Sequence, residues 1–285
     1  MTPRQFFSAK AFRTSLEERL KNRARKEGLD LQRLRRQVAF DRLLARLFFE
    51  PEGPWVLKGG YAMELEFESA RSTVDLDLTV RVPISGRIRR GTVLRALRTA
   101  AELSLEEFFE FRIGHPARNL AGGPYGGARY PVDSLIDGRT FVKFHVDISV
   151  GDILVAPLQQ VRCADWLAFA RIAPPLVTMT SREQQFAEKL HAYTLPRSTP
   201  NSRVRDLVDL VLLARSNLDV GLLGVAIRAT FDRRRTHPLP AQLPPPAESW
   251  KAPVDALAGQ CNLTADLGRA FAEVSQLFSQ IGQGR

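Results

Sequence analysis

The chain has 285 residues, of which 44% are hydrophobic, so it can bury the core of one elaborated domain or two modest ones. Its two cysteines form no CxxC pair and its four histidines lack metal-ligand spacing, which argues against a disulfide framework and a structural zinc site. The N-terminus is charged, and no apolar run reaches the roughly eighteen residues of a transmembrane helix, so we expect a cytoplasmic protein without a membrane segment.

The formal net charge of +10 favours a polyanionic partner. Neutralising phosphates releases condensed counterions, which gives affinity that does not depend on sequence. Arginines gather in residues 19–36, 87–98 and 233–235, as expected of a lined groove. Solvated helix faces show the same pattern. Nucleic acid is therefore the leading partner, and an anionic membrane is the second.

The beginning of the chain predicts helices followed by a strand and a turn. The apolar periodicity over residues 14–50 indicates two helices around Gly28. The apolar run 55–57 lies between a proline and a Gly-Gly pair, and it predicts a short strand that leads into a tight turn. A helix is expected over residues 61–67.

The middle of the chain contains two alternating segments. Residues 74–80 predict a half-buried strand with Asp75 and Asp77 on one face, and residues 141–150 predict a second strand with Asp147 on its polar face. Between them, a long helix is expected over residues 91–109. A loop or an irregular hairpin is expected over the Gly- and Pro-rich residues 114–131.

Beyond a Pro-Pro pair the chain is expected to be mainly helical, which sets a domain boundary near residue 176. Helices are predicted over residues 182–194 and 204–215, and residues 252–281 are expected to be largely helical. The Pro-rich residues 238–253 are expected to be extended.

The two carboxylates Asp75 and Asp77 suit Mg²⁺, which prefers hard oxygen ligands and shares them with substrate phosphates. A Gly-Gly pair between a strand and a helix allows backbone amides to hold a triphosphate. Each feature alone is common in ordinary turns and strand ends. Together with a third carboxylate, Asp147, they form the arrangement that two-metal nucleotidyl transfer requires.

These residues also carry a family resemblance. The stretch VLKGGYAMELEFESARSTVDLDL resembles the first motif of the AbiEii/AbiGii-type toxins, the group that includes the mycobacterial MenT nucleotidyltransferases. In that motif a KGG turn is followed by an R-x-[ST]-x-D-[IL]-D-[LF] strand, and the match runs position by position. The resemblance implies a nucleotide-binding set made of Lys58, Gly59, Gly60, Arg71 and Thr73.

Later motifs extend the resemblance over residues 35–255. FHVDISVG is similar to the family's third-carboxylate strand, and EQQFAEKLHAY followed by VRDLVDL is similar to its closing motifs. The resemblance implies three metal ligands, Asp75, Asp77 and Asp147. It implies a catalytic set of Asp75, Asp77, Asp147, Lys189 and Asp209, with Lys189 and Asp206 also binding the nucleotide.

Lys189 is expected within the apolar stripe of its helix. Its ammonium group could reach water past the apolar stem. The resemblance implies instead that it reaches the phosphates of the nucleotide, where it offsets charge in the transition state. Asp206 and Asp209 lie on a helix that is apolar nearly all round, so we expect them to be partly buried and paired. A structural salt bridge explains their pattern equally, and the resemblance favours Asp209 as the essential acid.

Thr73 lies two residues before Asp75 and is expected to face the metal site. In some members of the family the matching residue is phosphorylated by the antitoxin. A phosphate there would repel the triphosphate, which makes Thr73 a candidate regulatory phosphorylation site.

The resemblance implies a two-lobed α+β fold. Residues 1–176 would form a nucleotidyltransferase lobe with N-terminal helices and the mixed sheet of the DNA polymerase β-like superfamily. Residues 177–285 would form a helical lobe that closes the active-site cleft. We expect a monomer.

The same resemblance implies the toxin of a bacterial toxin–antitoxin pair, with a cognate antitoxin protein as partner. With Mg²⁺ at a two-metal site, it would transfer a nucleoside monophosphate from an NTP to the 3′ end of tRNA and so block translation. Two alternatives stay open. One is nucleotidylation of a protein hydroxyl, against which the arginine content argues. The other is a non-catalytic nucleic-acid-binding or antitoxin module, against which the intact set of acids argues.

Overall fold

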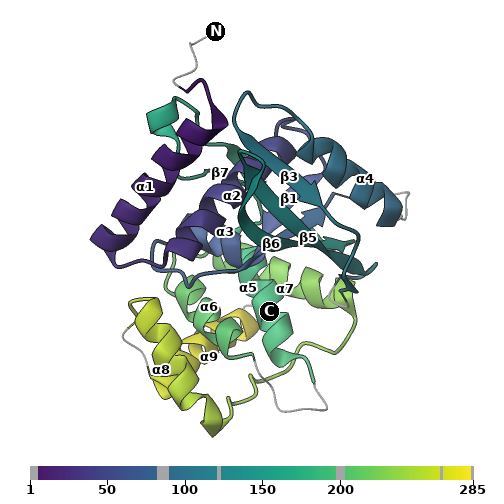
Figure 1. Ribbon diagram of the computed structural model, residues 1–285. Coiled ribbons are helices and arrows are strands. Elements are labelled where there is room, and N and C mark those ends of the chain that lie inside the picture. The colour runs from purple at the N-terminus through teal and green to yellow at the C-terminus, as the bar shows by residue number, and fades with distance from the viewer. Residues whose placement is uncertain (1–5, 82–89, 121–122, 197–202, 264–265, 284–285) are drawn as a thin grey trace. The chain divides into compact units, whose positions relative to one another are not determined.

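The computed structural model describes residues 6–81, 90–120, 123–196, 203–263 and 266–283 (Figure 1). The chain divides into two compact units. Unit 1 comprises Met1–Tyr61, Ser72–Gly151 and Gln160–Met179, and unit 2 comprises Ala62–Arg71, Asp152–Gln159 and Thr180–Arg285. Two segments of unit 2 thus precede the predicted boundary near residue 176, and the role of a separate closing lobe stays a prediction. Among the described helices, none has the length and apolar character needed to cross a membrane.

Unit 1 is built on a mixed sheet with eight strands in the part of the chain that the structure describes. They are β1 (Trp55–Lys58), β2 (Asp75–Val80), β3 (Phe109–Ile113), β4 (Arg118–Asn119), β5 (Gly127–Ile136), β6 (Arg139–Val150), β7 (Gln159–Arg162) and β8 (Leu176–Met179). The strand order is β3-β5-β6-β2-β1-β8-β7, and β4 pairs with β5. Strand β2 runs antiparallel to β1 and parallel to β6, which places the two aspartate strands side by side.

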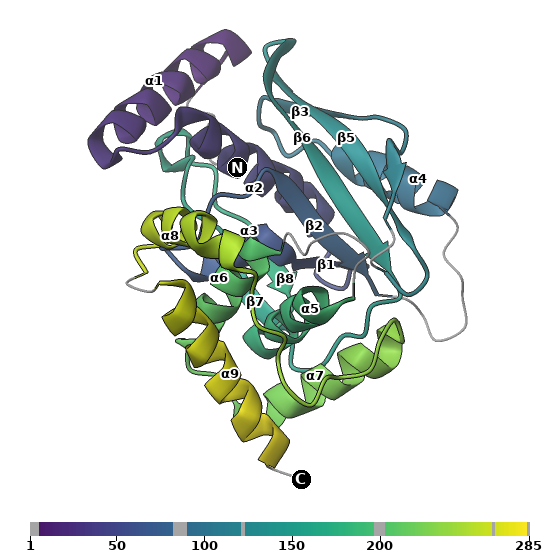
Figure 2. The same cartoon turned by 90° about the horizontal axis from the view of Figure 1, so that it is seen from below.

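Unit 1 also contains three helices, α1 (Ala9–Glu27), α2 (Leu31–Leu47) and α4 (Arg90–Ala101). Helix α2 packs against β6 (Figures 1 and 2). The Phe40 ring of α2 meets the Phe144 ring of β6 with their centroids 4.9 Å apart. The predicted break at Gly28 is confirmed. Gly28 ends α1 with a φ of +66°, a left-handed conformation that glycine adopts without a steric penalty.

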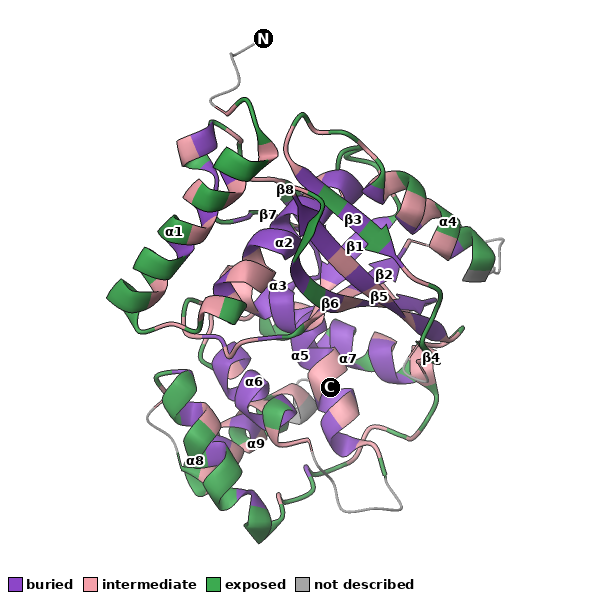
Figure 3. Ribbon diagram, in the orientation of Figure 1, coloured by how far each residue is buried: buried purple, intermediate pink, exposed green. Residues whose placement is uncertain are grey.

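Unit 2 is a group of helices around one apolar core. It contains α5 (Arg182–Thr194), α6 (Val204–Ala214), α7 (Val220–Arg234), α8 (Lys251–Gln260), α9 (Leu267–Gln283) and most of α3 (Gly59–Glu66). The side chains of α6 are almost all buried, whereas those of α8 are mostly exposed (Figure 3). Ser181 begins α5 by accepting a hydrogen bond from the Gln184 amide.

The boundaries of two predicted helices need correction, and one helix was missed. The helix expected over residues 91–109 ends at Ala101, and the aromatic segment that follows forms β3, because pairing with β5 outweighs its local helical pattern. The stretch 114–131, which was expected to be a loop or an irregular hairpin, contains an antiparallel pair made of β4 and the first half of β5. Helix α7 was not predicted. The predicted helix over residues 61–67 begins two residues earlier, at Gly59.

Candidate functional site

One row of charged side chains crosses the sheet of unit 1. The strand register places Lys58 opposite Asp77, and Asp77 opposite Asp147. It also places Asp147 opposite Arg129, and Arg129 opposite Arg118. Residues directly opposite one another in a sheet point to the same face. We call these five residues the charged row.

The other face of the same strands is apolar, and this fixes the direction of the acids. Its buried members on β2 and β6 are Leu76, Leu78, Val146 and Ile148. Because successive strand residues point to opposite faces, burying these four side chains directs Asp75, Asp77 and Asp147 to the face of the charged row. The three predicted metal ligands therefore share one face, as the alternation predicted.

Arg129 binds two of these carboxylates. Its Nε donates to Asp147 Oδ1 at 2.7 Å, and its Nη2 donates to Asp147 Oδ2 at 2.7 Å and to Asp75 Oδ2 at 2.6 Å. The hydrogen bonds to Asp147, together with the charges of both acids, raise the pKa of the Arg129 guanidinium above its usual value. Arg129 therefore stays a cation while it lies against these acids.

His145 completes the surroundings of Asp75. It lies opposite Asp75 in the strand register, and its Nδ1 is 3.4 Å from Asp75 Oδ1. The ring is partly exposed at the rim of the site. Since Arg129 contacts the other oxygen of Asp75, both oxygens of this carboxylate face a nitrogen.

The glycine pair lies directly against the site. Gly59 has a φ of +70°, and a Cβ atom built on it would overlap the Asp77 carboxylate. A Cβ atom on Gly60 would lie 2.6 Å from Thr73 Oγ1. The Gly60 amide also donates to Asp77 Oδ2 at 3.4 Å. Only glycine fits both positions, and the first turn of α3 brings backbone amides beside a carboxylate of the charged row.

Thr73 packs against this turn. Its hydroxyl donates to the backbone oxygen of Asp75 at 3.2 Å, and the residue is only 9% exposed. The side chain thus lies between the strand of the acids and the first turn of α3. Any group added to its oxygen would enter this narrow space.

The donor set of unit 1 suits Mg²⁺ in kind. Asp75, Asp77 and Asp147 offer carboxylate oxygens on one face, and a cation, the guanidinium of Arg129, already lies against two of them. Within the described ranges, no three acidic, histidine or cysteine side chains are grouped closely enough to ligate one metal ion. The three acids therefore suit the metal because they offer carboxylate oxygens from one face of the sheet. Their side chains must rearrange before they can hold one metal ion together.

Unit 2 contains a separate cluster of buried charges. Lys189 Nζ lies 2.6 Å from Asp209 Oδ2 and 3.3 Å from Asp206 Oδ1. Arg71 binds Asp209 through two parallel hydrogen bonds, of 3.0 Å from Nε and 2.8 Å from Nη2. Asp206 Oδ2 also lies 3.4 Å from Arg203 Nη1. We call Arg71, Lys189, Asp206 and Asp209 the buried cluster.

The charges of the buried cluster hold one another ionised. Burial alone would lower the pKa of Lys189, but Asp209 and Asp206 outweigh it and the pKa is raised. Burial alone would raise the pKa of Asp209, but Lys189 and Arg71 outweigh it and the pKa is lowered. Lys189, Arg71 and Asp209 therefore stay charged together in a mostly apolar helical unit.

The structure brings the predicted site residues together in two sets. Unit 1 gathers the three metal-ligand candidates with Gly59, Gly60 and Thr73, and Lys58 joins them through the register with Asp77. Unit 2 gathers the four members of the buried cluster. Arg71 belongs to the first motif by sequence, yet its guanidinium binds Asp209. The two acids of α6 were expected to be buried and paired, and both indeed contact Lys189.

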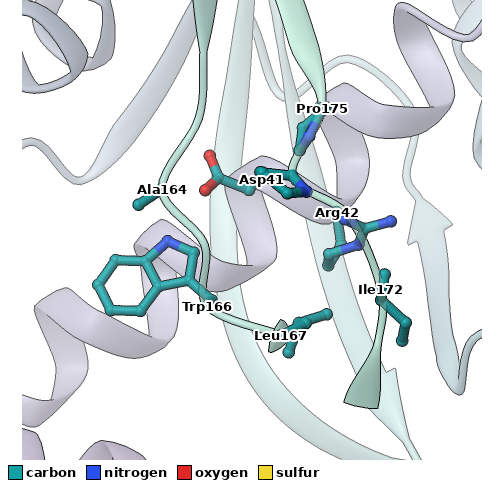
Figure 4. A pocket seen from close by; sticks show the side chains of 8 residues that line it. Asp41, Arg42, Ala164, Trp166, Leu167, Ile172 and Pro175 are labelled. Atoms are coloured by element: carbon teal, nitrogen blue, oxygen red, sulfur yellow. The ribbon is translucent and has the colours of Figure 1, made fainter. Parts of the chain in front are cut away.

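A buried acid supports the helix that carries the glycine pair. Tyr61, which follows Gly60 in α3, donates its hydroxyl to Asp41 Oδ1 at 2.5 Å. Asp41 lies on α2 in a narrow pocket that Trp166 and Leu167 also line (Figure 4). Burial raises the pKa of Asp41 to about 7, although hydrogen bonds from Tyr61 and Cys163 oppose the shift. This pocket has no room for a ligand, so we assign it a structural role.

Arg129 is the residue that sequence reasoning missed. It lies in the Gly- and Pro-rich stretch that was expected to be a loop or an irregular hairpin, without a role in the site. A signal was present, because Arg129, Pro131 and Asp133 alternate with Ala128, Tyr130 and Val132, as in a half-buried strand. The neighbouring glycines obscured that pattern.

Comparison with protein families finds one match that covers most of the chain. The model of the family described as nucleotidyl transferase AbiEii toxin, Type IV TA system, matches residues 42–274. No curated protein matches the chain.

Solved structures also resemble it. MenT4, the nucleotidyltransferase toxin Rv2826c from Mycobacterium tuberculosis H37Rv, aligns with a TM-score of 0.57 at 20% identity, over 95% of this chain and 97% of its own. JHP933 from Helicobacter pylori aligns with a TM-score of 0.48 at 16% identity, over 90% of this chain and 94% of its own. The likeness to MenT4 concerns the fold, which agrees with the predicted nucleotidyltransferase architecture.

Proposed function

Because the chain belongs to the AbiEii family of nucleotidyltransferase toxins from type IV toxin–antitoxin systems, we propose that it transfers a nucleoside monophosphate from an NTP to the 3′ end of tRNA. A tRNA extended in this way is not aminoacylated, so translation stops. A cognate antitoxin would restrain the activity.

One observation carries this proposal. Asp75, Asp77 and Asp147 share one face of the sheet, beside a turn at which neither glycine can carry a side chain. Three acids lie on one sheet face there, beside backbone amides, and such an arrangement suits a metal-bound triphosphate once the side chains rearrange. A catalytically idle module has no physical need for this arrangement.

The acids would hold Mg²⁺, with Asp75 and Asp77 as ligands from β2 and Asp147 as the ligand from β6. When bound, the metal would neutralise phosphate charge and make the attacking hydroxyl more acidic. Asp147 lies next to Asp77 in the register, so it is placed to attract the proton of that hydroxyl.

The turn at Gly59 and Gly60 would bind the triphosphate through backbone amides, helped by the positive end of α3. Lys58 would add a positive charge from the neighbouring position of the charged row. The absence of side chains on the glycines lets the phosphates approach the backbone closely.

Lys189 and Arg71 would supply further cations to the nucleotide, and Asp209 would orient both of them. Its carboxylate already binds both groups, so it acts as a positioning residue. Asp206 contacts only Lys189 among the two cations. This difference favours Asp209 as the essential acid.

The net charge of +10 supports an RNA acceptor over a protein acceptor, because A-form RNA is bound largely through its phosphates and 2′-hydroxyls. The test is to incubate the protein with each labelled NTP, Mg²⁺ and either total tRNA or total protein. We expect the label in the tRNA fraction, at the 3′ end. Label in the protein fraction would favour nucleotidylation of a hydroxyl, and label in neither would contradict an enzyme.

The metal role has a matched pair of variants. Asp75→Ala should abolish transfer while the protein keeps its fold. Asp133→Ala removes another carboxylate from the same face of the sheet, where it pairs with the exposed Lys143 at 3.2 Å, and it should leave transfer unchanged. Equal activity of both variants would refute the role of Asp75.

A further inference from the structure

We propose that Arg129 is a built-in counter-ion that occupies the carboxylates of the metal-free enzyme and exchanges with the divalent metal. In this proposal, which rests on the proposed nucleotidyl transfer, the released guanidinium then binds the phosphates of the donor. Arg129 would thus be a further residue of the reaction, and it would couple metal binding to nucleotide binding.

The first support is the completeness of the contact. Arg129 donates to both oxygens of Asp147 and to one oxygen of Asp75, at 2.6 to 2.7 Å. His145 lies beside the remaining oxygen of Asp75. Mg²⁺ would need these oxygens at about 2.1 Å. Mg²⁺ at that distance would be repelled by the Arg129 guanidinium, so the metal and the guanidinium compete for the same acids.

The second support is that the exchange needs only a side chain to move. Strand β5 is paired with β6 along its length, so the backbone of Arg129 stays in register with Asp147. The guanidinium is partly exposed to solvent at the end of a flexible stem. It can therefore turn away from the acids while it remains on the same sheet face.

The third support is the neighbourhood into which the guanidinium would turn. The next residue of the charged row is Arg118, which is exposed on β4. An anion near this edge would meet two arginines, and the planar guanidinium group matches phosphate with two parallel hydrogen bonds. The phosphates of the donor are such an anion.

A plain structural brace predicts the opposite result. If Arg129 only held the acids in place for the metal, its removal would weaken metal binding. If Arg129 competes with the metal, its removal strengthens metal binding in the absence of nucleotide and weakens nucleotide binding.

The experiment measures Mn²⁺ binding to the full chain without nucleotide, by calorimetry. For Arg129→Gln we expect the Kd of Mn²⁺ to fall at least about tenfold, the size of effect that one adjacent charge produces. Arg118→Gln is the matched control, since it removes one positive charge from the same row, and no bond from Arg118 to the acids is found in the described chain. We expect it to change the Kd by less than about threefold.

An unchanged or larger Kd for Arg129→Gln would overturn the proposal, as would an equal fall for Arg118→Gln or no Mn²⁺ binding to any of the proteins. A second measurement follows Arg129 in the wild-type protein itself, and a variant is needed only to assign its NMR signal. In the ¹⁵N-labelled wild-type protein, the Nε–H signal of Arg129, assigned by its loss in Arg129→Lys, should shift when Mg²⁺ is added. A signal that ignores Mg²⁺ would also overturn the proposal.

These results are separable from the proposed function. If Arg129 exchanges with Mn²⁺ and no label reaches tRNA, the acceptor assignment fails and the counter-ion stands. If label reaches tRNA and Arg129→Gln leaves the Kd of Mn²⁺ unchanged, the counter-ion proposal is wrong and the acceptor assignment stands.

Discussion

Lys189 and Asp209 form a buried ion pair with Nζ 2.6 Å from Oδ2, and the same carboxylate receives two hydrogen bonds from Arg71. The side chain of Asp209 is only 2% exposed. Taking a charge out of water is costly unless it is paired and hydrogen-bonded. The charges of Lys189, Arg71 and Asp209 therefore depend on one another, and Asp209 has the central position.

Asp209→Asn should destabilise the protein strongly. The asparagine keeps the shape of the side chain but removes the charge, which leaves Lys189 with Asp206 alone and Arg71 without its bound carboxylate. Breaking a buried pair from one side typically costs about 3–5 kcal/mol of unfolding free energy. Urea denaturation of wild type and variant would measure the difference.

The control for this prediction is Glu273→Gln. Glu273 binds Arg215 with a similar distance of 2.7 Å, but the two side chains are 35% and 36% exposed. Exposed pairs contribute at most about 1 kcal/mol because water screens them. Equal losses in the two variants would contradict the importance of burial at Asp209.

Gly59→Ala should impair both stability and transfer. The new methyl group would overlap the Asp77 carboxylate, and the residue would keep a positive φ that L-residues rarely adopt. We expect a loss of about 1–3 kcal/mol in unfolding free energy. We also expect transfer to fall at least about a hundredfold, because misplaced catalytic groups cost that much.

Gly28→Ala separates the two causes. Gly28 has a similar φ of +66°, but no atom lies within 4 Å of the Cβ position. The substitution should therefore cost about 1 kcal/mol from backbone strain and leave transfer per folded molecule unchanged. A similar loss of transfer in both variants would show that the contact with Asp77 is unimportant.

The strands of the acids and the glycine turn were predictable from sequence because their signals are local. The alternation of apolar and polar residues along β2 and β6 was enough to place Asp75, Asp77 and Asp147 on polar faces. The proline and the glycine pair that flank β1 predicted the turn. The helices α5 and α6 were predicted almost to the residue, since each shows strong apolar periodicity and few breakers.

The remaining features depend on long-range pairing. The contact of Arg129 with Asp147 requires β5 to pair with β6, and the local alternation of residues 128–133 does not specify that partner strand. The role of Arg71 is similar. It lies 138 residues before Asp209 in the chain, so only the fold of unit 2 brings their side chains together. The stop of α4 at Ala101 likewise depends on the pairing of β3.

Stability should fall as the pH rises from about 4 to about 7, because of Asp41. Burial raises the pKa of Asp41 from 3.8 to about 7, against hydrogen bonds from Tyr61 and Cys163 and the charge of Arg42. Between these values the unfolded chain releases a proton that the folded chain keeps. The unfolded state then binds fewer protons, so the free energy of unfolding decreases with rising pH.

Asp41→Asn isolates this effect, because it removes the titrating group and keeps an acceptor for Tyr61. Between pH 5 and 6 the wild type should lose about 1.4 kcal/mol per pH unit relative to the variant, and the loss should level off as the pH passes 7. Chemical denaturation of both proteins across this range measures the difference. Parallel pH profiles would contradict a neutral, buried Asp41.

A negative charge at Thr73 should weaken binding of the nucleotide. The Thr73 hydroxyl lies against the first turn of α3 and bonds the backbone of Asp75, so a phosphate there would bring about two negative charges beside the acids. Thr73→Glu brings one negative charge and Thr73→Gln a neutral side chain of the same size. We expect the Kd of NTP, measured with Mg²⁺ present, to be at least about tenfold higher for the glutamate than for the glutamine.

The comparison between these two variants cancels the cost of size. Thr73 is nearly buried, so both long side chains must displace neighbours near Gly60, and both proteins should lose stability to a similar extent. What differs between them is the charge. If glutamate and glutamine weaken the nucleotide equally, phosphorylation at Thr73 would act by steric exclusion rather than by repulsion, and any bulky modification there would inhibit equally well.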